Sequence, residues 1–311
     1  MVKGIAKILA VLAFCSLVVT FREVIVSAGS IASSADPAFL GLSIVGLFIY
    51  RVFNATGWGK VANALGGQVG LVDGASVWLK TESFRWLPGS VWGYCSRALL
   101  GQQLGLNRQQ ASLSLTLELS LTLGAWIGTA LIFSLISSVS IFPSGLVNLI
   151  ATLGITGIFG LSLMPVLYKT SAKVRRHVKE LITLKDFEIK PLVLLEVLIF
   201  YSVLCCFNGF CFFLICSSLG ITSLSIGQAL AANSQAFLIG LFALIAPGGI
   251  GVREGSLAAI LSSYTSVETA LAAALLWRGT QLLVELICLL VVFAEIALKS
   301  RFQEKEGYLR C

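Results

Sequence analysis

Long apolar runs with very little charge dominate this chain, and they restrict its fold more than any other feature. Of its 311 residues, 57% are hydrophobic and 12% are charged, and the mean hydropathy is +0.93. A soluble domain carries about 25% charged residues, and no packing of such a chain hides this much apolar surface from water. The sequence therefore predicts a polytopic membrane protein. It argues against a soluble secreted protein, a nucleic-acid-binding protein and a disulfide-rich scaffold.

Apolar runs near 20 residues long, the length that crosses a ~30 Å hydrocarbon core, define the candidate membrane spans. Six helices are predicted to cross the membrane: 5–20, 39–53, 111–136, 146–167, 192–219 and 270–298. The first run follows two lysines and also resembles a signal peptide, but the many later spans favour a retained helix. We expect residues 1–311 to form a single integral-membrane domain.

Two further regions are apolar but interrupted, so neither is expected to cross the membrane as one helix. Each contains a proline-glycine break: Pro88-Gly89 in residues 61–104 and Pro247-Gly248-Gly249 in residues 228–261. Unwound backbone at membrane depth is tolerated only inside protein or along a water-filled cavity. Short Gly/Pro-broken segments at matching places in two halves are typical of the inverted repeats of secondary transporters.

The distribution of basic residues predicts the orientation of these segments. The connection 169–190 holds seven Lys or Arg residues against three acidic ones, and both chain ends are also basic. The positive-inside rule therefore places this basic loop and both termini in the cytoplasm. The first interrupted region then starts and ends inside, and the second starts and ends outside. We predict an all-α fold of about six spans with two oppositely inserted re-entrant helical hairpins.

One segment has a pattern that also fits a β-strand. From 112 to 123 leucine alternates strictly with Ser, Thr or Glu, and this period of two is typical of strands, including those of membrane barrels. The other apolar runs are far longer than a barrel strand, so we predict a helix here. In a helix Ser114, Glu118 and Thr122 share one face.

Six ionisable residues fall within the predicted membrane region, where a charge at the helix centre costs at least ~2.5–3.5 kcal/mol. They are Arg97, Glu118, Arg253, Glu254, Arg278 and Glu285. Such residues either bind a ligand or hold the bundle together as ion pairs. Arg97 with Glu118 and Arg253 with Glu285 are the pairs that the second interpretation predicts, and the sequence leaves both interpretations open.

The two breaks favour a binding site for an anion. Arg97 and Arg253 each follow a proline-glycine break, and the helices that begin there direct their positive dipole ends to the same region. We expect the glycines at 248, 249 and 251 to act as a hinge. All three glycines, Gly248, Gly249 and Gly251, belong to the second break.

Other features predict packing rather than chemistry. Residues 54–64 are polar enough to lie along the cytoplasmic surface as an amphipathic helix, and Trp58, Trp78, Trp86 and Trp92 are typical interfacial anchors. The chain has eight cysteines, no CxxC pair and one histidine, so neither a metal nor a cofactor is expected.

Two motifs resemble a known family. The segment Arg85-Trp-Leu-Pro-Gly-Ser-Val-Trp, followed by Arg97 and Glu118, and the later segment Ala-Pro-Gly-Gly-Ile-Gly-Val-Arg-Glu-Gly at 246–255 resemble the lysylphosphatidylglycerol synthase transmembrane-region family. The family includes the flippase part of bacterial multiple-peptide-resistance proteins. The resemblance implies a lipid-translocating domain whose two re-entrant hairpins meet near mid-membrane. Its bifunctional relatives carry a soluble aminoacyl-transferase domain after this region, and because this chain ends at residue 311, lysine transfer is not expected.

The leading hypothesis is a flippase-like translocase of the inner or plasma membrane. It would move a phospholipid or polyprenyl-phosphate lipid with an anionic headgroup, which Arg97 and Arg253 would engage while Glu118, Glu254 and Glu285 counter their charge. Membrane lipids are the expected partners, and lipid-modifying enzymes or glycosyltransferases are further candidates. The alternatives are a membrane-embedded enzyme and a non-transporting accessory subunit that acts with lipid-linked substrates; a closed, salt-bridged interior without a cavity would indicate the accessory subunit.

Overall fold

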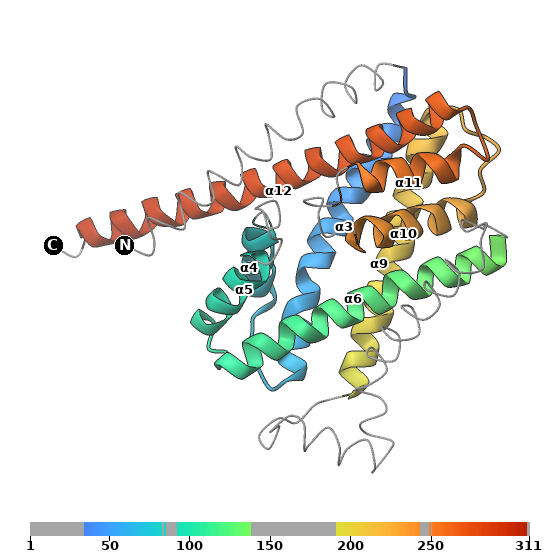
Figure 1. Ribbon diagram of the computed structural model, residues 1–311. Helices are drawn as coiled ribbons and strands as arrows, with labels where there is room; N and C mark the ends of the chain where they lie inside the picture. The colour runs from blue at the N-terminus through green and yellow to red at the C-terminus, as the bar shows by residue number, and fades with distance from the viewer. Residues whose placement is uncertain are drawn as a thin grey trace, which may run out of the picture.

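The computed structural model describes residues 34–82, 84, 92–137, 191–242, 249 and 251–309, and every regular element within them is helical (Figure 1). The helices are α3 (Pro37–Ala64), α4 (Leu71–Glu82), α5 (Trp92–Gln103), α6 (Arg108–Ser137), α9 (Pro191–Ser218), α10 (Ile226–Phe242), α11 (Val252–Leu261) and α12 (Val267–Leu309). The prediction of an all-α fold is confirmed for this part of the chain.

Four of these helices are long and apolar enough to cross a membrane. They are α3, α6, α9 from Leu192 to Ser218, and the Val267–Ala294 part of α12. Each has 27 to 30 residues, and at 1.5 Å per residue this exceeds the ~30 Å hydrocarbon core. They coincide with the predicted spans 39–53, 111–136, 192–219 and 270–298. The predicted spans 5–20 and 146–167 and the basic loop 169–190 lie outside the described residues, so the total of six spans remains a prediction.

Helix α3 differs from its prediction because it continues to Ala64. Its start is fixed by Asp36, whose side chain accepts a hydrogen bond from the Ala38 amide, with Pro37 in the first turn. The expected surface helix 54–64 is wrong, because this segment is the buried second half of α3. Small residues allow the burial: a Cβ at Gly57 would collide with the Tyr201 hydroxyl of α9.

Two tryptophans in this region were wrongly predicted to be interfacial anchors. Trp58 is 0% exposed and donates its indole hydrogen bond to Ser114, and Trp78 is buried against Glu118. Trp92 is half exposed, whereas Trp86 lies outside the described residues. A buried indole needs a partner for its N–H, and α6 supplies both acceptors.

Helix α6 settles the ambiguity between strand and helix. The whole alternating segment lies within this 30-residue helix. Ser114 and Glu118 are buried on its inner face, so the prediction of a shared polar stripe is confirmed for these two residues. The leucine repeat gives no strand here because the apolar residues encircle the helix, as membrane burial requires.

Two pairs of short helices pack among the four long ones (Figure 1). Helices α4 and α5 have 12 residues each, and α10 and α11 have 17 and 10, so none covers a full hydrocarbon core. Hydrogen bonds locate their ends: Gln110 to Leu65 at 3.2 Å beside the first pair, and Ser223 to Tyr264 at 2.6 Å beside the second. Asp36 N donates to Ser218 O at 2.8 Å, so the start of α3 lies beside the end of α9. The two pairs therefore follow opposite ends of the long helices, and the insertion of 61–104 and 228–261 as re-entrant hairpins remains a prediction.

The break between α10 and α11 is only partly described, since Pro247 and Gly248 lie outside the described residues, as do Pro88 and Gly89 between α4 and α5. Gly249 has a φ of 71°, and a Cβ there would lie 2.7 Å from the Gly240 carbonyl oxygen of α10. The chain therefore turns against α10 at a point that only glycine fits.

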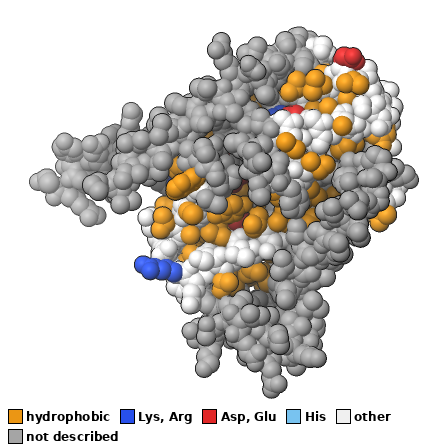
Figure 2. Space-filling model, viewed as in Figure 1, with side chains coloured by type: hydrophobic (Ala, Val, Ile, Leu, Met, Phe, Trp, Pro, Cys, Tyr) orange, Lys and Arg blue, Asp and Glu red, His pale blue; other side chains and the backbone are white. Residues whose placement is uncertain are grey.

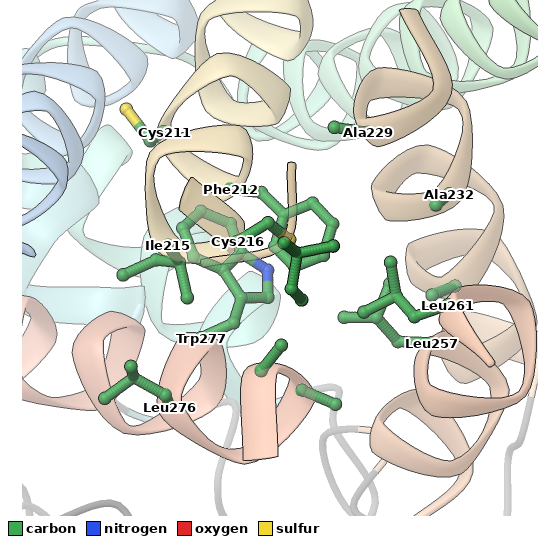
Figure 3. Close-up of a cluster of buried hydrophobic side chains, with 14 of the residues drawn as sticks. Cys211, Phe212, Ile215, Cys216, Ala229, Ala232, Leu257, Leu261, Leu276 and Trp277 are labelled. Atoms are coloured by element: carbon green, nitrogen blue, oxygen red, sulfur yellow. The ribbon is translucent and has the colours of Figure 1, made fainter. Parts of the chain in front are cut away.

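The interior and the surface are both apolar, as a membrane protein requires. Helices α9, α11 and α12 share a core in which Phe212 and Trp277 pack with ring centroids 5.4 Å apart (Figure 3). Apolar side chains also cover much of the described face, with few charged groups between them (Figure 2). Exposed leucine and valine on α3, such as Leu42 and Val45, mark surfaces that face lipid.

Candidate functional site

Arg97 of α5 lies in a cage of acceptors. Its Nη1 donates to Glu118 Oε2 at 2.7 Å, its Nη2 contacts Glu82 Oε2 at 3.3 Å, and its Nε donates to Thr81 Oγ1 at 3.0 Å. The guanidinium carbon also lies 5.2 Å from the centroid of the Trp78 ring. Arg97 is 3% exposed, so each of its nitrogens is satisfied by protein rather than by solvent.

Glu118 is held from two sides. Besides the Arg97 contact, its Oε1 accepts a hydrogen bond from Trp78 Nε1 at 2.7 Å. Both carboxylate oxygens are therefore occupied by donors from α4 and α5. The Arg97–Glu118 pair is one of the two that the ion-pair interpretation predicted, and it is confirmed. The buried charges of Arg97 and Glu118 are tolerated because each is paired with the opposite charge.

Arg51 of α3 joins this cluster to the last helix. Its Nη2 forms an ion pair with Glu285 Oε2 at 2.9 Å, and its Nη1 lies 3.8 Å from Glu82 Oε1. Glu82 thus stands between Arg51 and Arg97 and shares one oxygen with each. The resulting ion-pair network runs Glu118–Arg97–Glu82–Arg51–Glu285 and connects α3, α4, α5, α6 and α12.

A second ion pair fixes the start of α11. Glu254 Oε1 lies 3.1 Å from Arg278 Nε of α12, a close charge contact without hydrogen-bond alignment. Glu254 Oε2 accepts a hydrogen bond from the Gly251 amide at 2.6 Å, so this acid also caps its own helix. The α11 N-terminus, which was expected to attract an anionic ligand, thus already holds a carboxylate of the chain.

A cavity of about 60 Å³ lies beside the ion-pair network, where helices α3, α6, α9, α10, α11 and α12 meet. The residues that line it are Leu47, Tyr50, Arg51, Trp126, Asn208, Phe237, Arg253, Gln281 and Val284. This volume has room for a few water molecules but not for a lipid headgroup. Its polar wall contains two arginines and two amides and, among the described lining residues, no carboxylate.

Arg253 reaches the cavity over an aromatic stack. Its guanidinium carbon lies 4.5 Å from the centroid of the Phe237 ring, and Phe237 stacks on Trp126 with centroids 4.2 Å apart. Gly240 makes this approach possible, because a Cβ there would lie 2.9 Å from Arg253 Cβ. A guanidinium over an aromatic face is attracted to the ring and still has N–H donors for hydrogen bonds to a ligand.

The predicted site residues therefore fall into three groups. Arg97, Glu118 and Glu285 belong to the ion-pair network, Glu254 and Arg278 form the pair at α11, and Arg253 lines the cavity. Arg97 is not among the described residues that line the cavity. Arg51 takes part in both places, since it pairs with Glu285 and lines the cavity.

Sequence reasoning missed three residues of this site: Arg51, Glu82 and Asn208. Arg51 stands near the end of the predicted span 39–53 and was not counted among the intramembrane charges, but it lies near the middle of α3. Extending that span through the second half of α3 would have placed Arg51 well away from the ends of the helix. Asn208 has no comparable signal, because one neutral amide in an apolar run does not alter the hydropathy of the run.

Comparison with known proteins adds a family. The family model described as Lysylphosphatidylglycerol synthase TM region matches residues 4–288. This range contains every described residue of the ion-pair network and of the cavity. No curated protein matches the chain.

Proposed function

We propose, from the premise that this chain belongs to the lysylphosphatidylglycerol synthase TM region family, that it moves an anionic-headgroup lipid between membrane leaflets. Membership associates the protein with membrane lipids. The proposal of translocation rests on one observation: Arg51 and Arg253, from two different helices, line one partly open cavity among the apolar spans. Charge at such depth is costly and is usually retained for a ligand or an ion pathway.

The cavity suits a phosphate group chemically. Guanidinium groups bind phosphate through paired N–H donors, and these charge-assisted hydrogen bonds are roughly twice as strong as neutral ones. The present cavity is too small for a whole headgroup, so cargo entry requires the surrounding helices to separate. The α10–α11 break is the proposed hinge, because Gly249 and Gly251 both hold positive φ there. Opening between repeats is the usual motion of transporters with broken helices.

In this proposal Arg97 is a positioning residue. Its three donor groups face Thr81, Glu82 and Glu118, and by holding Glu82 it fixes the acid that also faces Arg51. The earlier prediction that Arg97 contacts the phosphate directly is replaced by this indirect role. Glu285 completes the arrangement, because it pairs with Arg51 from the opposite side at 2.9 Å.

The two alternative functions fit the geometry less well. An accessory subunit was expected to have a salt-bridged interior without a cavity, whereas this interior has both ion pairs and a cavity with arginines in its wall. A membrane enzyme needs an acid or base that reaches its substrate. Among the described residues, the carboxylates of the site are held in ion pairs with arginine.

The decisive measurement is leaflet-resolved transport of fluorescent phosphatidylglycerol in vesicles that contain the purified protein. Arg253→Gln is expected to lower the transport rate by at least ~10-fold, because a hydrogen bond to a charged group contributes about 1.5–3 kcal/mol. Arg51→Gln should act in the same direction. Arg108→Gln, which changes an exposed arginine at the start of α6, is the matched control and should transport at the wild-type rate.

Two outcomes would contradict the proposal. One is wild-type protein that moves the lipid no faster than empty vesicles. The other is transport at the wild-type rate by folded Arg51→Gln and Arg253→Gln. Helix content and monodispersity in detergent establish that each variant is folded.

A further inference from the structure

A hydrogen-bonded relay of three buried side chains leads from the core to the cavity. Trp277 Nε1 of α12 donates to Asn233 Oδ1 of α10 at 2.9 Å. Asn233 Nδ2 then donates to Asn208 Oδ1 of α9, also at 2.9 Å. Trp277 packs beside Phe212 and Cys216 of α9 in the core, so its indole has a fixed place (Figure 3).

The chemistry of the relay fixes the direction of both amides. An indole nitrogen only donates, so the Asn233 atom that it contacts is the oxygen. The remaining group of Asn233 is its NH₂, which also only donates, so the Asn208 atom facing it is again the oxygen. Asn208 is thereby left with its NH₂ directed away from Asn233.

That NH₂ belongs to a residue of the cavity wall. Asn208 is 2% exposed and lines the cavity together with Arg51 and Arg253. None of the residues in the described part of the chain accepts a hydrogen bond from its NH₂. A donor that faces a cavity with room for water is able to exchange a water molecule for an oxygen of a bound ligand.

We infer that Asn208 donates a hydrogen bond to a phosphate oxygen of the lipid headgroup in this cavity, and that Asn233 and Trp277 are positioning residues that hold its amide in the donating direction. The inference rests on the proposed function, because it assigns a ligand contact within the same cavity. The wall then presents donors from three helices, namely Arg51 of α3, Asn208 of α9 and Arg253 of α11. Such a wall favours a headgroup whose phosphate carries the net negative charge, as in phosphatidylglycerol.

The test is binding of two short-chain lipids to the full chain in detergent, by titration calorimetry. Dihexanoyl-phosphatidylglycerol carries the phosphate, and dihexanoylglycerol lacks it. Asn208→Leu, which keeps the branched shape of the side chain but removes both its donor and its acceptor, should weaken phosphatidylglycerol binding by about 10-fold and leave dihexanoylglycerol binding unchanged. A merely structural role for Asn208 would affect both ligands equally or neither.

Trp277→Phe tests the relay itself. Without the indole donor both amides are able to reverse, so phosphatidylglycerol binding should weaken by roughly three- to tenfold with no change for dihexanoylglycerol. Trp58→Phe is the matched control, because Trp58 is also buried and also donates to one side chain, Ser114 at 3.0 Å, but does not line the cavity. Its phosphatidylglycerol affinity should equal that of the wild type.

The outcomes separate this inference from the proposed function. Equal phosphatidylglycerol affinity in wild type and folded Asn208→Leu overturns the inference, even where the vesicles show transport. Affinity that depends on Asn208 supports it, even where the vesicles show none and the translocase proposal fails. Wild-type affinity in Trp277→Phe removes the positioning roles of Trp277 and Asn233.

Discussion

Replacing Glu118 with leucine is expected to lower the free energy of unfolding by about 3–5 kcal/mol, because it leaves the Arg97 charge without its closest counter-ion. The Arg97 Nη1–Glu118 Oε2 distance is 2.7 Å, and both residues are buried. Trp78 also loses the acceptor of its indole hydrogen bond. The measurement is reversible unfolding in mixed micelles by titration with a denaturing detergent.

A double variant gives this prediction its control. Arg97→Met combined with Glu118→Leu removes both charges, so it should recover most of the lost stability, as apolar replacements of buried ion pairs often do. Glu196→Leu, which removes an exposed carboxylate of α9, should have little effect. Glu118→Leu with wild-type stability would mean that the pair contributes nothing to the fold.

The same double variant tests the role of Arg97 in transport. If Arg97 acts by positioning, a folded double variant should keep measurable transport, at a rate above that of Arg253→Gln. If Arg97 contacts the cargo, transport should fall to the level of empty vesicles although the protein is stable.

The second large effect is expected at Gly249. Gly249→Ala forces a side chain into a left-handed backbone conformation, with φ at 71°, and places its Cβ 2.7 Å from the Gly240 carbonyl oxygen. Left-handed strain costs about 1–2 kcal/mol and overpacking a further 1–3 kcal/mol, so we expect a total loss of about 2–5 kcal/mol in the free energy of unfolding.

Gly251→Ala is the matched control for this position. Gly251 has a φ of 79°, but a Cβ there would meet nothing within 4 Å. It should therefore show the strain alone, about 1–2 kcal/mol, in the same unfolding measurement. Equal losses in the two variants would show that the approach of Gly249 to α10 does not restrict the break.

The spans could be predicted because membrane burial imposes a length and an apolar composition on local sequence. This holds for α6, where length outweighed the period-two pattern, and for α9, whose predicted and observed bounds nearly coincide. The second half of α3 could not be predicted in this way. Its polarity and glycine content are typical of a surface helix, and its burial depends on contacts with α4, α6 and α9 that are distant in sequence.

The sequence identified candidate site residues only where a single residue stands out from its surroundings. A charge within an apolar run does so, and Arg97, Glu118, Arg253 and Glu285 were selected for this reason. The Arg97–Glu118 pair was one of the two predicted ion pairs. For Glu285 the predicted partner was Arg253, whereas the ion pair that the structure describes is with Arg51. Arg51 lies more than two hundred positions away, and only the fold brings it within 2.9 Å. The role of Asn208 depends on hydrogen-bond direction, which sequence does not encode.

The single carboxylate between two guanidinium groups has a mechanical consequence. Glu82 faces Arg97 at 3.3 Å and Arg51 at 3.8 Å, and the latter is the longest contact in the ion-pair network. In the proposed transport cycle, an Arg51 that turned toward an incoming phosphate would lose its contact with Glu82, while Glu82 kept its contact with Arg97. Cargo binding would thereby remove the ion contact between α3 and α4, while the Arg97–Glu118 pair still joined α5 to α6.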